Sequence, residues 1–116
     1  MPHEYKSPEY FAQGLRDAFN RFGEKHGWGF SAEQSRGTVT FRFKGNLYSV
    51  DFVDNGNKTQ ANLETLTEGS DGKEWKIISQ FTLKPSRSKT GRVPENYYVR
   101  LIKEQILSPL SDSNRQ

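Results

Sequence analysis

The chain has 116 residues, of which 32% are hydrophobic, and it carries a formal net charge of +3. These values predict a single domain with a modest core, to which eight Phe, five Tyr and two Trp supply most of the buried area. The sequence contains no cysteine, which excludes disulfides, thiol catalysis and thiolate metal sites. No apolar run is long enough for a membrane span or a signal peptide, so we expect a cytoplasmic protein without a membrane segment.

The first element predicted along the chain is an amphipathic helix that begins near Ser7. Ser7 followed by Pro8 is typical of an N-cap and a first helical turn. Apolar residues then recur with helical spacing and form one stripe: Phe11, Leu15, Ala18, Phe19 and Phe22. Residues 1–6 are expected to be flexible. Residues 27–33 are compatible with either an extra strand or an irregular lid over one end of the core.

Residues 38–67 predict three antiparallel strands, because polar and apolar residues alternate around two turn signals. The first signal is Gly45-Asn46, which suits a type II′ turn, and the second is Asn55-Gly56, the preferred type I′ pair. Two-residue loops at both signals would bring the apolar residues of one face opposite one another. The expected pairs are Phe43 with Tyr48, Phe41 with Val50, Phe52 with Thr59, and Val50 with Ala61.

A fourth strand is predicted after the polar turn at residues 68–73, where the alternation of polar and apolar residues resumes. A loop with an odd number of residues would set Trp75 opposite Thr67 and Ile77 opposite Thr65. In that register Trp75 and Ile77 both face the core.

A second helix is predicted to open at Pro94-Glu95. Its apolar positions recur at intervals of four, at Tyr98, Ile102 and Ile106. We expect this helix to end at Pro109 and residues 108–116 to be flexible. Helix, meander of four strands (five with the extra strand) and helix together predict a two-layer α+β domain that spans residues 1–116.

Enzymatic chemistry has little support in the sequence, so we predict a non-enzymatic binding module with no cofactor and no metal. The only histidines are His3, in the expected flexible end, and His26, near a helix terminus. Without thiolates or paired histidines, the usual ligand sets of transition metals are missing. No phosphate-binding glycine loop and no nucleophile-elbow pattern is present.

Positive charge is concentrated in one window of the chain, since no acidic residue lies between Glu74 and Glu95. Basic groups bind phosphates by releasing counterions, so this window favours a nucleic acid, either DNA or RNA, as the partner. An exposed basic loop would supply the main contacts, and one face of the sheet would extend them. The predicted nucleic-acid-binding residues are Lys84, Arg87, Lys89, Arg92, Arg42 and Lys76.

The alternative partner is a protein. Apolar residues also fall on the face of the predicted sheet that should face solvent, at Leu47, Leu66 and Ile78. Left uncovered, they would form a binding patch for an adaptor or inhibitor, and a free sheet edge would offer a second mode of binding. Covered by the second helix, they would instead make the sheet a middle layer.

Overall fold

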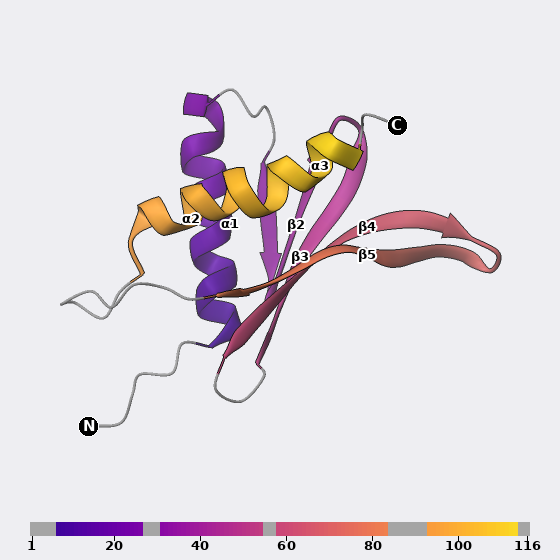
Figure 1. Cartoon of the computed structure of the whole chain (residues 1–116), viewed down its shortest axis with the longest axis horizontal. Coiled ribbons are helices and arrows are strands. Elements are labelled where there is room, and N and C mark those ends of the chain that lie inside the picture. The colour runs from indigo at the N-terminus through magenta and orange to yellow at the C-terminus, as the bar shows by residue number, and fades with distance from the viewer. Residues whose placement is uncertain (1–6, 27–30, 55–57, 84–92, 114–116) are drawn as a thin grey trace.

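A five-stranded antiparallel meander forms the centre of the molecule, with the strands in chain order across the sheet (Figure 1). The computed structural model describes residues 7–26, 31–54, 58–83 and 93–113. The strands are β1 Ala32–Ser35, β2 Thr38–Phe43, β3 Asn46–Asp54, β4 Thr59–Gly69 and β5 Gly72–Leu83. The helices are α1 Pro8–His26, α2 Glu95–Leu101, the π-helical η1 Ile102–Leu107, and α3 Ser108–Ser113. The predicted α+β architecture is confirmed, with five strands. The fifth strand, β1, shares only Ala32 and Glu33 with the range 27–33 considered for an extra strand, and residues 27–30 lie outside the described residues.

Helix α1 packs its apolar stripe against the first three strands. Phe11 and Phe19 are both buried, and the Phe19 ring lies 4.8 Å from that of Phe41 on β2, measured between centroids. At the start of the helix, the backbone N–H of Tyr10 donates a hydrogen bond to Ser7 Oγ at 3.2 Å. Ser7 therefore caps the helix as the sequence predicts.

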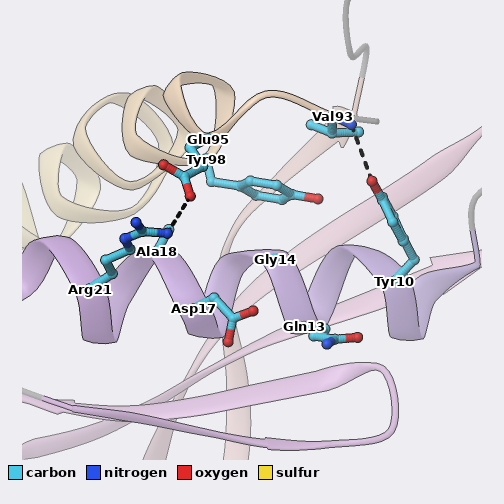
Figure 2. Close-up of a pocket in the computed structure, with 9 residues that line it drawn as sticks. All are labelled: Tyr10, Gln13, Gly14, Asp17, Ala18, Arg21, Val93, Glu95 and Tyr98. Atoms are coloured by element: carbon cyan, nitrogen blue, oxygen red, sulfur yellow. Dashed lines mark hydrogen bonds and ion pairs between the residues drawn. The ribbon is translucent and has the colours of Figure 1, made fainter. Parts of the chain in front are cut away.

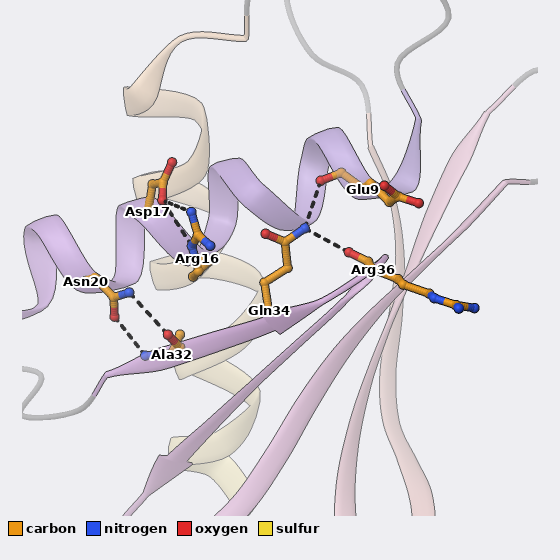
Figure 3. Close-up of polar contacts among 7 residues, drawn as sticks. All are labelled: Glu9, Arg16, Asp17, Asn20, Ala32, Gln34 and Arg36. Atoms are coloured by element: carbon orange, nitrogen blue, oxygen red, sulfur yellow. Dashed lines mark hydrogen bonds and ion pairs between the residues drawn. The ribbon is translucent and has the colours of Figure 1, made fainter.

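Polar side chains hold the edge strand β1 against α1 (Figure 3). The Asn20 amide donates to the carbonyl of Ala32 at 3.2 Å, and the Ala32 backbone N–H donates back to Asn20 Oδ1 at 2.8 Å. The Gln34 amide donates to the carbonyls of Glu9 and Arg36, at 3.3 and 2.8 Å. These contacts give a strand of only four residues a fixed position at the edge of the sheet.

The C-terminal helical segment runs across α1 and joins the same hydrophobic core (Figure 1). Its buried side chains are Tyr98, Leu101, Ile102, Ile106 and Leu110. The expected end at Pro109 differs from the structure, in which the helix continues to Ser113 and Leu110 is fully buried. Proline lacks an N–H and clashes with the carbonyl four residues back in a continuous α-helix. Here Pro109 is the second residue of α3, and the segment before it, η1, is π-helical and not α-helical.

The β2–β3 hairpin turns one residue earlier than predicted. Its loop is Lys44-Gly45, whose φ angles of 52° and 84° match the two positive values of a type I′ turn. Phe41 therefore pairs with Tyr48 and not with Val50. The predicted register is wrong by two positions, which leaves the same face buried because side chains alternate with period two.

The β3–β4 hairpin is displaced in the same way. Val50 pairs with Leu63, not with Ala61, and four residues, 55–58, separate the two strands. The predicted Asn55-Gly56 turn lies outside the described residues. The observed register excludes a two-residue loop there, and it again keeps the predicted core face.

A β-bulge in the β4–β5 ribbon reverses the predicted orientation of Trp75 and Ile77. Between Leu63 and Glu64 the register shifts by one residue, so that Ile78 of β5 has no partner on β4. Beyond the shift Ile77 pairs with Glu64 and Trp75 pairs with Leu66. A shift of one residue moves side chains to the other face. The prediction that both residues face the core is therefore wrong: Trp75 is 42% exposed and Ile77 is 49% exposed.

Candidate functional site

The sheet face opposite the buried core, called the outer face from here on, carries an apolar row across three strands. The outer face includes Thr38, Thr40, Arg42, Leu47, Ser49, Asp51, Val53, Gln60, Asn62, Glu64, Leu66, Glu68, Lys73, Trp75, Ile77, Gln80 and Thr82. Within it Leu66 pairs with Trp75, and the register of β3 and β4 sets Leu47 on the other side of Leu66. Ile77 lies in the adjoining row. The described helices pack on the other side of the sheet, where the core cluster lies.

A shallow depression of about 200 Å³ adjoins Trp75 on the outer face. It is lined by Thr38, Thr40, Ser49, Asp51, Glu64 and Trp75. The Thr38 hydroxyl donates to Asp51 Oδ1 at 2.8 Å. Burial raises the pKa of the Glu64 carboxyl above its ordinary value of 4.5, and the negative charge of Asp51 raises it further. Two neighbouring carboxylates favour a cation at this depression and disfavour a phosphate.

We expect Glu64→Gln to raise the free energy of unfolding at neutral pH, by less than about 1 kcal/mol because the site is only partly buried. A raised pKa means that the native state keeps its proton to a higher pH than the unfolded chain does. The contribution of Glu64 to wild-type stability therefore falls as the pH rises from 4.5 through the folded pKa. Denaturant titrations at neutral pH and below pH 4.5 measure this difference. The advantage of the variant should vanish at the acidic pH, and a less stable variant at neutral pH would contradict the assignment.

The basic residues predicted to bind nucleic acid do not form one track on the described part of the sheet. Arg42 lies on the outer face, opposite Leu47. Lys76 pairs with Thr65 and therefore lies on the other face, because the bulge shifts the phase of β5. The remaining predicted residues, Lys84, Arg87, Lys89 and Arg92, lie outside the described residues.

Two of the three apolar residues proposed for a protein partner, Leu47 and Leu66, lie half-buried on the outer face. Ile78 does not join them, since it packs against the core at the bulge. The sequence prediction missed Trp75 and Ile77, which it had placed inside. The adjacent pair Ile77-Ile78, which breaks the strict alternation, was the one sign of a bulge here.

A second candidate site is the cleft where α2 crosses α1, with a volume of about 420 Å³ (Figure 2). Its lining includes Tyr10, Gln13, Gly14, Asp17, Arg21 and Tyr98. The Tyr98 ring lies directly over the backbone of α1 at Gly14, where a Cβ would overlap the ring. A glycine is therefore needed in the middle of α1 to let the two helices approach this closely.

Tyr98 brings an unpaired polar group into this cleft. The residue is 4% exposed, and its hydroxyl has no hydrogen-bond partner among the described residues. Burial raises the pKa of Tyr98 well above 10.0, so the hydroxyl stays protonated and remains a donor. By contrast, the Tyr10 hydroxyl accepts a bond from the Val93 N–H at 3.1 Å, and Arg21 forms an ion pair with Glu95 at 2.8 Å.

No protein-family model, no curated protein and no solved structure matches this chain. Within the described residues, no group of three or more His, Cys, Asp or Glu side chains is placed to hold a metal ion. None of the helices in these same ranges is long and apolar enough to cross a membrane. Function must therefore be inferred from the outer face and the cleft themselves.

Proposed function

We propose that this protein is a non-enzymatic binding module that docks a protein partner on the outer face of its sheet. The proposal rests on one observation: the bulge turns Trp75 and Ile77 outward, where they are 42% and 49% exposed. Leu47 and Leu66 extend this apolar surface across the sheet. Contiguous exposed apolar surface marks protein interaction sites, and aromatic side chains are enriched in their centres.

The charges beside the apolar row indicate the chemistry of the partner. Glu64 and Asp51 line the depression next to Trp75, where burial and then the negative charge of Asp51 raise the pKa of Glu64. A lysine or arginine placed between them would offset this repulsion and would fix the orientation of the partner. We therefore expect a partner segment that sets an apolar side chain against Trp75 and a basic side chain against the two carboxylates.

Peptide selection on the immobilised protein tests this proposal. A random displayed library should yield peptides that combine an aromatic or aliphatic residue with Lys or Arg. Synthetic copies should bind Trp75→Ala and Ile77→Asp at least about tenfold more weakly than wild type, as expected for the loss of a central contact. Both side chains are partly exposed, so the variants should stay folded, which circular dichroism will verify.

Val53→Asp is the matched control for Ile77→Asp. Val53 is 42% exposed on the outer face but pairs with Gln60, away from the apolar row. The selected peptides should therefore bind this variant with wild-type affinity. Peptides rich in acidic residues, or peptides that bind Trp75→Ala as well as wild type, would contradict the proposal.

A second candidate function is nucleic-acid binding, favoured by the absence of acidic residues between Glu74 and Glu95. Its main contacts would come from Lys84, Arg87, Lys89 and Arg92. The exposed Trp75 ring would offer a surface on which a base can stack. It ranks second because Asp51 and Glu64 on the outer face would repel the phosphate backbone.

Titration of labelled single- and double-stranded oligonucleotides at two salt concentrations separates the two functions. Nucleic-acid binding would weaken steeply with salt, and neutralising these four basic residues would flatten the slope of log affinity against log salt by about three to four units. The affinity for a docked peptide should depend only weakly on the salt concentration. The absence of oligonucleotide binding at low salt would exclude the second function.

A further inference from the structure

We propose that the cleft between α1 and α2 is a binding site for a small, planar, uncharged amide, whose carbonyl accepts a hydrogen bond from the Tyr98 hydroxyl. The cleft lies on the helix side of the sheet, whereas the proposed protein-docking surface is the outer face. The inference is therefore independent of the proposed function.

Two unfavourable features coincide in this cleft. Glycine is one of the least favourable residues inside a helix, yet Gly14 sits in the middle of α1 because the Tyr98 ring lies over it. The Tyr98 hydroxyl is buried without a partner among the described residues, although phenylalanine would fill the same space without that penalty. A buried donor kept at such a site is explained if a ligand supplies the missing acceptor.

The lining of the cleft indicates an uncharged ligand. Its cation, Arg21, is paired with Glu95 at 2.8 Å, which offsets its charge. The Asp17 carboxylate on the same lining is likewise paired, with Arg16 at 2.8 Å, so the cleft presents no uncompensated charge from either residue to a ligand. The protonated Tyr98 hydroxyl can donate to a neutral carbonyl, which needs no charged partner in the cleft.

The shape and the remaining polar groups point to a planar amide. The rings of Tyr10 and Tyr98 provide flat apolar walls, and Figure 2 shows the Tyr98 hydroxyl directed toward Tyr10 over Gly14. The Gln13 amide offers an acceptor for the N–H of a ligand whose carbonyl meets Tyr98. The volume of about 420 Å³ lies within the range of small-molecule sites.

A panel of small neutral ring amides, with nicotinamide as the reference, tests the ligand class. Each is titrated into the ¹⁵N-labelled full chain at millimolar concentrations, and nicotinate serves as the anion of matched shape. We expect saturable shifts centred on the backbone amides of Gln13, Gly14 and Tyr98, and affinity at least about tenfold weaker for nicotinate. If no neutral amide of the panel produces saturable shifts there, or if nicotinate binds equally well, the proposal is wrong.

Tyr98→Phe tests the hydroxyl itself. The variant keeps the ring but should lose at least about tenfold in affinity for the best amide. Tyr97→Phe removes a hydroxyl from the neighbouring residue, which does not line the cleft, and should bind like wild type. Without ligand, Tyr98→Phe should unfold at a higher denaturant concentration than wild type. A less stable Tyr98→Phe, or one that binds the amide with unchanged affinity, would show that the hydroxyl is satisfied within the protein and would overturn the proposal.

Discussion

Phe41→Ala is expected to lower the free energy of unfolding by about 3–5 kcal/mol, because it leaves a cavity at the centre of the core. The Phe41 ring is 2% exposed and sits between two other rings. Its centroid lies 4.8 Å from that of Phe19 on α1 and 5.7 Å from that of Tyr48 on β3. Truncation removes contacts to both layers at once, so neighbouring side chains cannot easily close the gap. Denaturant unfolding followed by circular dichroism measures the loss.

Arg42→Ala is the control for this experiment, since Arg42 is the next residue of β2 and its exposed side chain lies on the outer face. Substitutions at such positions change stability by no more than about 0.5 kcal/mol. Comparable losses in the two variants would mean that the faces of β2 have been assigned wrongly.

Gly14→Ala is expected to destabilise the protein by about 1–3 kcal/mol, although alanine is the better helix former. The new methyl group would overlap the Tyr98 ring, which is 4% exposed and has little room to move. The cost of overpacking therefore exceeds the helix-propensity gain of about 1 kcal/mol. Denaturant unfolding of the single variant gives the magnitude.

The cause of this loss can be isolated in a second background. In Tyr98→Ala the obstructing ring is absent, so Gly14→Ala should become stabilising by up to about 1 kcal/mol. Gln13→Ala, at the exposed neighbouring position, should change the free energy of unfolding by the same amount in wild type and in Tyr98→Ala. A destabilising Gly14→Ala in the Tyr98→Ala background would show that contact with the ring is not the reason for the glycine.

The alternation of polar and apolar residues predicted the core face of β2 and β3 correctly even though both hairpin registers were wrong. A register error of two positions changes every cross-strand pair but no side-chain orientation. The first error arose because Lys44 adopts a positive φ, which is uncommon for a residue with a long side chain. The turn therefore forms at Lys44-Gly45, one residue before the pair that the sequence favours.

The outer face was only partly predictable. Leu47 and Leu66 follow from simple alternation, whereas Trp75 and Ile77 depend on an extra residue in β5. A bulge is an exception to the very periodicity from which faces are deduced, so alternation alone cannot locate one.

The cleft between α1 and α2 was not predictable from local patterns. Tyr98 was correctly expected on the buried stripe of the second helix, and Gly14 stands inside a strong helical pattern. Each residue is unremarkable by itself. Their contact depends on the crossing of two helices far apart in the chain, which neither periodicity nor turn chemistry determines.

The bulge also determines where the β4–β5 ribbon, which extends away from the helices in Figure 1, can lose a residue. Deleting Ile78 would join the two ladder segments into one regular register and would leave Ile77 opposite Glu64 and Trp75 exposed, at the expense of the contact of Ile78 with the core. Deleting Lys76 would also remove the mismatch and leave Trp75 opposite Leu66, but it would set Ile77 opposite Thr65 on the other face and Ile78 opposite Glu64. The residue lost from this stretch therefore decides whether Ile77 or Ile78 faces outward beside Trp75.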